Sequence, residues 1–171
     1  MINKERIASV EIFKGLRQDE LKEIAELCEE VIFAGGDRVL TEGERADYFY
    51  ILEEGRVDLR FEFPDCKASE DTTVGTIEPG ECFAWSAMVP QHIATLSCYS
   101  TGMSRGIRIE GIKLLNLCKR NNRIGFIIMQ NIAVMIRHRL TKLEALFVGR
   151  KLEARRFLNF RQQTRQTERA W

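Results

Sequence analysis

Short segments rich in β-branched and aromatic residues, separated by glycine-containing turns, constrain the fold of this 171-residue chain more than any other feature. The turn signals include Gly35-Gly36-Asp37, Glu54-Gly55 and Pro79-Gly80. Short strands at intervals of about ten residues are typical of a β-sandwich or a jelly-roll barrel. We therefore predict a mainly β fold built around a jelly roll, or double-stranded β-helix. The expected strands are residues 31–33, 38–40, 48–52, 57–63, 73–77, 94–97 and 106–109.

Helical spacing flanks the β region on both sides. Residues 2–14 and 18–30 have the spacing of helices, and Leu21, Ile24, Ala25 and Cys28 share one apolar face of the second. A short helical piece contains Ile112, Leu115 and Leu117, and a long helix begins near residue 122. We predict three parts: a β-roll domain with N-terminal helices at 1–118, a long helix at 119–160, and a polar tail at 161–171.

The long helix carries two apolar stripes. The first follows an alternating spacing of three and four residues, which is the pattern of a coiled-coil seam. Its members are Phe126, Met129, Ala133, Ile136, Leu140, Leu143 and Phe147. The second stripe is Ile124, Ile128, Ile132 and Met135. If one stripe packs on the helix's own barrel, the other is available to a partner, so we predict a homodimer held by the first stripe. The alternative is a single wide face buried inside one subunit.

Charge is distributed unevenly along the chain. Residues 1–104 contain 10 Lys and Arg against 21 Asp and Glu, whereas residues 105–171 contain 16 against 4. The basic helical end either complements the acidic barrel of its own chain or approaches an acidic partner such as nucleic acid or a membrane surface. No apolar run approaches the roughly 18 residues of a membrane span, so we expect no membrane segment and a cytoplasmic protein.

The residues that usually form metal centres are few and scattered. The five cysteines form no CxxC pair, and His92 and His138 are the only histidines. We therefore predict buried free thiols and no metal site. The sequence also contains no nucleophile–base pair and no phosphate-binding loop of the Walker type, so we expect a protein that is not an enzyme. These patterns indicate no definite cofactor.

Several spaced motifs resemble the cyclic nucleotide-binding domain family. The segment Ile12-Phe13-Lys14-Gly15-Leu16 is similar to the helical entry of that family, and the block from Tyr50 to Val57 to its strand–turn–strand signature. The run Ile77-Glu78-Pro79-Gly80, followed by Phe83, resembles the approach to the phosphate-binding cassette. The similarity covers about residues 8–145. With the long helix, it looks most like the sensor half of the catabolite activator and fumarate–nitrate regulator superfamily.

The cassette itself departs from the family pattern. In the family a glutamate accepts the ribose 2′-hydroxyl and an arginine pairs with the phosphate, and this resemblance places Trp85 and His92 at those two positions. Ala84 stands where the family has glycine. The candidate ligand-binding residues are Phe83, Ala84, Trp85, Ser86, Ala87, His92, Ala94 and Thr95.

The resemblance implies a homodimeric regulatory or sensor module in signal transduction or transcription regulation. Because both polar anchors are replaced, we expect a small effector that is not a standard cyclic nucleotide. One alternative is an atypical receptor for cyclic AMP or cyclic GMP, in which a bound cyclic nucleotide is the cofactor and a protonated His92 contacts the phosphate. Another is the sensing half of a DNA-binding transcription regulator, which would contact DNA only through a separate module, because residues 148–171 are too few for a helix-turn-helix.

Overall fold

A computed structural model describes residues 2–62 and 72–168, apart from the side chains of residue 146 and residues 150–168. The elements are α1 (Lys4–Ala8), η1 (Glu11–Phe13), α2 (Gln18–Ala25), β1 (Cys28–Phe33), β2 (Arg38–Leu40), β3 (Tyr48–Glu54), β4 (Val57–Arg60), β5 (Thr73–Ile77), β6 (Cys82–Phe83), η3 (Trp85–Met88), β7 (Ser97–Ser100), β8 (Ser104–Glu110), α3 (Gly111–Arg120) and α4 (Asn122–Glu168). They form two compact units, Met1–Val134 and Met135–Trp171.

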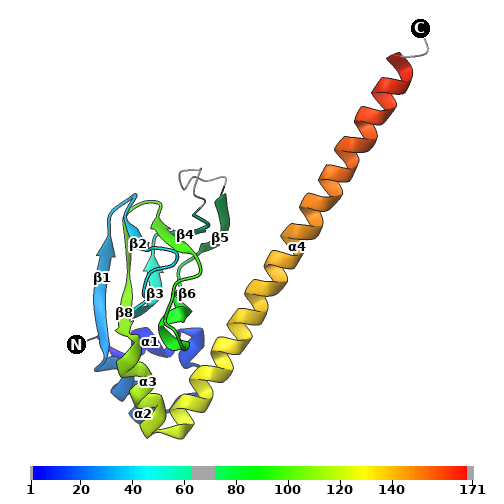
Figure 1. The fold of residues 1–171 in the computed structure, drawn as a ribbon. Helices are drawn as coiled ribbons and strands as arrows, with labels where there is room; N and C mark the ends of the chain where they lie inside the picture. Colours follow the sequence, from blue (N-terminus) through cyan, green and yellow to red (C-terminus); the bar gives the residue numbers. More distant parts are fainter. Residues whose placement is uncertain (1, 63–71, 169–171) are drawn as a thin grey trace. The chain divides into compact units, whose positions relative to one another are not determined.

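The first unit contains two antiparallel four-stranded sheets (Figure 1). One sheet has the order β1-β8-β3-β6 and the other β2-β7-β4-β5, so all neighbouring strands except β4 and β5 are non-consecutive in sequence. This arrangement, with flanking helices and a long C-terminal helix, confirms the predicted mainly β fold.

Strand β3 shows why the first sheet is covered on both faces. Its even-numbered residues Tyr50 and Leu52 belong to the apolar cluster between the sheets. Phe49 and Ile51 point to the opposite face, because side chains alternate along a strand. They are also fully buried, as are Ile107 and Ile109 of β8. The helical face of this sheet is therefore a second core.

Several local expectations were wrong. The helix predicted for 18–30 ends at Ala25, and Cys28 begins β1, because residues 28–33 pair with β8 along their whole length. The strand predicted for 94–97 instead begins at Ser97, and a further short strand, β6, pairs Cys82 and Phe83 with β3. In these cases pairing with a distant strand outweighs local propensity. The strand predicted for 57–63 ends at Arg60, and the helical stretch 2–14 is divided into α1 and η1.

The long helix α4 is continuous from Asn122 to Glu168, and therefore extends through most of the residues expected as a polar tail. Asn121 precedes it, and the Oδ1 atom of Asn121 accepts a hydrogen bond of 3.3 Å from the backbone N–H of Ile124. This is the usual role of asparagine at a helix N-terminus. Among the described residues, no helix is both long enough and apolar enough to cross a membrane.

Candidate functional site

The candidate cassette begins at the aromatic residue Phe83. Phe83 pairs with Tyr50 across β6 and β3, and the two rings stack with centroids 4.9 Å apart and an interplanar angle of 12°. Phe33 meets Tyr50 edge-on at 5.9 Å. Burial raises the pKa of the Tyr50 hydroxyl. The wall of the roll beside the cassette is therefore aromatic.

Ala84 has a left-handed backbone, with φ of 60° and ψ of 42°, where the family pattern has glycine. This conformation costs an L-residue other than glycine about 1–2 kcal/mol. Its carbonyl oxygen accepts a hydrogen bond of 3.1 Å from Ala87 N–H, which closes the short helix η3. Ala84 thus adopts a backbone conformation that glycine adopts without the steric cost of a Cβ. Trp85 and Ser86 follow at the start of η3 and are half-buried, whereas Ala87 is buried.

His92 is bound by its own loop. Gln91 and His92 both have positive φ, of 80° and 50°. The Nδ1 atom of His92 lies 3.0 Å from the carbonyl oxygen of Ala87. A carbonyl oxygen can only accept a hydrogen bond, so Nδ1 carries a hydrogen and is the donor. The His92 carbonyl oxygen in turn accepts from Ala46 N–H at 2.7 Å.

The other end of the cassette pairs with the connection between β2 and β3. Ala94 N–H donates to the Glu44 carbonyl oxygen at 2.8 Å, and the Ala94 carbonyl oxygen accepts from Gly43 N–H at 2.9 Å. Ala94 is buried, but Thr95 is exposed. The structure therefore brings residues 84–87 together in η3 and places His92 and Ala94 beside residues 43–46.

His92 and Ala87 line a cleft of about 320 Å³. The other lining residues are Arg45, Ala46, Asp47, Tyr48, Glu110 and Ile112. Its charged side chains are paired: Arg45 Nε lies 2.7 Å from Asp47 Oδ1, and Glu110 lies 2.6 Å from Lys113 Nζ. His92, which the sequence motifs predict at the arginine position of the family, thus lines a cleft together with these charged side chains.

The space between the sheets is apolar. Its buried residues are Tyr50, Leu52, Val57, Leu59, Ile77, Phe83 and Cys98, and half-buried apolar side chains surround them. Two tyrosine hydroxyls and one thiol are the polar side-chain groups among these residues. The guanidinium of Arg108 lies beside them, 4.6 Å from the centre of the Tyr48 ring. Arg108 is also paired with Glu29 at 2.9 Å, so this cation already has an acidic partner.

The cysteines do not form a reactive or metal-binding group in the described residues. Cys28, Cys82, Cys98 and Cys118 are buried free thiols, and Cys66 lies outside those residues. Burial, with a smaller contribution from Glu53, raises the pKa of Cys28 to about 12. Across the ranges 2–62 and 72–168, no group of three or more His, Cys, Asp or Glu side chains is arranged to hold a metal ion.

The predicted seam on α4 is exposed. In the first unit Phe126 is 69% exposed, and Met129 and Ala133 are exposed as well. In the second unit Phe147 is 69% exposed, and Ile136, Leu140 and Leu143 are exposed to a smaller extent. The second stripe is buried, with Ile124 and Ile128 both 0% exposed.

Two groups of residues at these sites are not among those predicted from the sequence. The alternation of Tyr48, Tyr50 and Leu52 was the signal for the inward face of β3, since residues two apart share a face. Arg45 and Asp47 gave no such signal, because they belong to a connection between strands whose course depends on tertiary pairing.

Comparison with known proteins gives one family. The model of the cyclic nucleotide-binding domain matches residues 30–121. A cAMP-dependent protein kinase type II regulatory subunit from Drosophila melanogaster is 27% identical over 99 residues, which are 58% of this chain and 25% of the relative. The chain thus spans about a quarter of that relative's length.

Two solved structures support the same relationship. A crystal structure described as a cyclic nucleotide-binding protein from Geobacter metallireducens GS-15 is 30% identical, with a TM-score of 0.72, and the match covers 82% of this chain and 99% of that one. The sensor domain of the transcriptional regulator DNR from Pseudomonas aeruginosa is 18% identical, with a TM-score of 0.65 and coverages of 81% and 91%, and shares the fold. The chain belongs to the cyclic nucleotide-binding domain family.

Proposed function

We propose that this family member is a non-enzymatic, homodimeric regulatory module whose effector is a small molecule other than a standard cyclic nucleotide. The observation that carries the proposal is the position of His92. The resemblance of the motifs assigns His92 to the place of the family's phosphate-binding arginine. In the structure its ring donates to the Ala87 carbonyl oxygen and lines a cleft with Arg45. Trp85 replaces the ribose-binding glutamate at the same time.

The expected loss of affinity is large. A hydrogen bond to a charged group contributes about 1.5–3 kcal/mol. Without both anchors, binding of a cyclic nucleotide weakens by roughly two to four powers of ten. Arg108 lies beside the apolar cluster, but its guanidinium is already paired with Glu29, so it is a weak replacement for the missing arginine.

Titration with cyclic AMP and cyclic GMP tests the ligand. The two tryptophans are Trp85 and Trp171, so Trp171→Phe leaves Trp85, in the candidate cassette, as the one fluorescent reporter. We expect neither a calorimetric signal nor a change of Trp85 fluorescence at millimolar nucleotide. Micromolar binding of either nucleotide would refute the proposed ligand class.

The alternative of an atypical cyclic-nucleotide receptor has its own signature. If His92 contacts the phosphate, affinity rises as the imidazole becomes protonated, because only the charged ring attracts the anion strongly. His92→Ala would abolish that gain. Binding that neither pH nor His92→Ala alters would exclude this alternative.

The homodimer is supported by the exposed seam on α4. Exposed apolar side chains continue from Phe126 to Phe147 at coiled-coil spacing, which is the usual signature of a helix that buries one face against another helix. The double variant Ile136→Asp, Leu140→Asp should sediment as a monomer in analytical ultracentrifugation.

The matched control for the dimer places two aspartates on the same helix away from the seam. Thr141 and Ala145 are exposed and lie outside the seam spacing, so Thr141→Asp, Ala145→Asp should remain a dimer. A dimer in the seam variant, or equal dissociation of both variants, would refute the proposed interface.

The output we propose is signal transduction or transcription regulation through the orientation of α4, and contact with DNA would require a separate module. We further propose a cytoplasmic location. The buried free thiols of the described cysteines support it, since thiols persist in reducing compartments. The protein by itself, without a separate DNA-binding module, should show no salt-dependent affinity for DNA. A steep salt dependence would indicate direct contacts with the phosphates and would contradict this proposal.

A further inference from the structure

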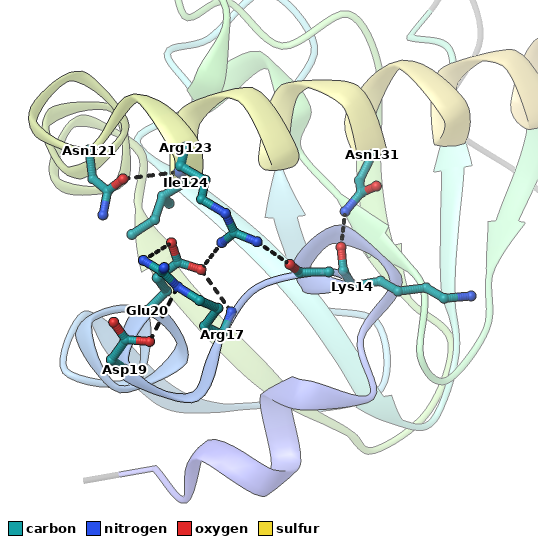
Figure 2. Close-up of polar contacts among 9 residues, drawn as sticks. Lys14, Arg17, Asp19, Glu20, Asn121, Arg123, Ile124 and Asn131 are labelled. Carbon is teal, nitrogen blue, oxygen red and sulfur yellow. Dashed lines mark hydrogen bonds and ion pairs between the residues drawn. The ribbon is translucent and has the colours of Figure 1, made fainter.

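The first turns of α4 are tied to the N-terminal segment by a group of polar contacts that the family resemblance does not account for (Figure 2). We call this group the clasp and define it as Glu20 with Arg17, Arg123 with the Gly15 carbonyl, and Asn131 with the carbonyls of Ile12 and Lys14. All of these residues lie in the first unit.

Glu20 is the centre of the clasp. Its side chain is 1% exposed, although it is charged and sits in the first turn of α2. Its Oε2 atom accepts from the backbone N–H of Arg17 at 2.7 Å, which is one half of a helix capping box. The guanidinium of Arg123, from α4, donates to the same oxygen. A buried carboxylate thus depends on a cation more than 100 residues away in sequence.

Arg123 holds a second point of the N-terminal segment. Its Nη2 atom donates to the carbonyl oxygen of Gly15 at 3.1 Å. Gly15 lies between η1 and α2 and has a φ of 93°, a conformation that glycine adopts without the steric cost of a Cβ. In the connection between η1 and α2, residues of α4 supply the hydrogen-bond donors for the carbonyl oxygens of Lys14 and Gly15.

Asn131 repeats the arrangement farther along α4. Its Nδ2 atom donates to the carbonyl oxygens of Ile12 and Lys14, at 2.9 and 3.0 Å. Eight residues separate Arg123 from Asn131, which is about 12 Å along a helix. Two anchoring points this far apart fix the rotation of α4 as well as its position. Apolar packing of Ile124 and Ile128 has no directional preference and would fix the rotation less strictly.

We propose that the clasp is a conformational latch, which holds the N-terminal segment and the first turns of α4 in one register and must open before α4 can reorient. Opening it separates Glu20 from Arg123 and leaves the buried carboxylate with Arg17 alone, and a buried charge that loses one of its two cations is disfavoured. If the latch operates in this way, the conformation of residues 11–20 is coupled to the orientation of α4. It acts within one chain and does not depend on which molecule the roll binds or on the proposed dimer.

Hydrogen exchange of the full chain tests the latch. We expect Arg123→Gln and Asn131→Ala to accelerate amide exchange together in residues 11–20 and 122–134, on the order of tenfold to a hundredfold, with β3 and β8 unchanged. The matched control is Arg17→Gln, which removes an arginine from the same carboxylate without touching α4. This control should leave exchange in residues 122–134 unaltered.

A double-mutant cycle decides whether the two elements are coupled. Glu20→Gln and Arg123→Gln should each accelerate exchange in α4, and the double variant should add little to the larger single effect, because both remove one interaction. Additive effects, or faster exchange confined to the substituted element, would overturn the latch. Asn131→Ala removes only neutral hydrogen bonds from a half-buried side chain, so it provides a folded variant for the same readout.

Discussion

Along the first turns of α4, one face carries Ile124, Ile128 and Ile132, and roughly the opposite face carries Phe126 and Met129. Both faces are apolar, yet the isoleucine face is buried and the other is exposed. Polar side chains distinguish them: Asn131, which lies beside the isoleucines on the helix surface, contacts the N-terminal segment. Hydrophobicity marks a face that can be buried, and directional polar contacts indicate which face the domain itself buries.

The largest expected difference between the two faces is in stability. Ile128→Ala removes a fully buried side chain and should cost about 2–5 kcal/mol of unfolding free energy. Phe126→Ala changes an exposed side chain and should stay within about 0.5 kcal/mol in the monomer. Urea unfolding, at a concentration where sedimentation shows monomer, measures both. Equal losses for the two variants would break the comparison.

The buried face should also carry a pH dependence. Burial raises the pKa of Glu20, but the hydrogen bonds from Arg123 and from the Arg17 backbone outweigh it, so this pKa lies below its ordinary value. The stabilisation is present above the unfolded pKa, near 4.3, and is lost as pH falls through the folded pKa.

Wild type should therefore lose more stability than Glu20→Gln as the pH falls from neutral to 3, because only wild type has a carboxylate to protonate there. Denaturant unfolding at a series of pH values measures the difference. Parallel pH profiles for the two proteins would show that the carboxylate is not stabilised by its arginines.

Gly125 tests how closely the backbones of α3 and α4 approach each other on the buried side of the helix. A Cβ atom on Gly125 would lie 2.8 Å from the carbonyl oxygen of Cys118 in α3, so α3 and α4 are close here because this residue has no side chain. Gly125→Ala should destabilise the domain by about 1–2 kcal/mol, even though alanine favours a helix by about 1 kcal/mol. A melting temperature of this variant above that of wild type would contradict the close packing of α3 and α4 at Gly125.

The fold was largely predictable from sequence, because its signals are local. Turn glycines such as Gly55 and Gly80 do adopt positive φ, and they separate the strands that the pattern predicts. The two stripes of α4 were also visible in the sequence, since a helix repeats every 3.6 residues. Pairing between distant strands was not visible, and it moved the start of β7 to Ser97 and added β6.

The sequence motifs indicate which residues to consider for the candidate site, but not how the loop at His92 is oriented. Alignment placed His92 opposite the family's arginine, yet two successive residues with positive φ turn this loop, and neither Gln91 nor His92 is glycine. No residue type at these positions signals such a turn. The pairing of Glu20 with Arg123 was equally hidden, because only the completed fold brings the two residues together.

Substitution of Gly149 should change stability by the smallest amount and in the opposite direction, towards greater stability. It lies in the second unit, and a Cβ atom built on it meets nothing within 4 Å. Gly149→Ala should therefore stabilise α4 by about 0.5–1 kcal/mol, because alanine loses less conformational entropy than glycine in a helix. Circular dichroism at 222 nm should show a higher melting temperature or greater helicity. The same substitution made at Gly125 is the matched control, so two chemically identical changes in one helix should shift stability in opposite directions. If both variants gain stability, the contact between Gly125 and Cys118 does not restrict α4; if both lose it, Gly149 has a neighbour that limits its side chain.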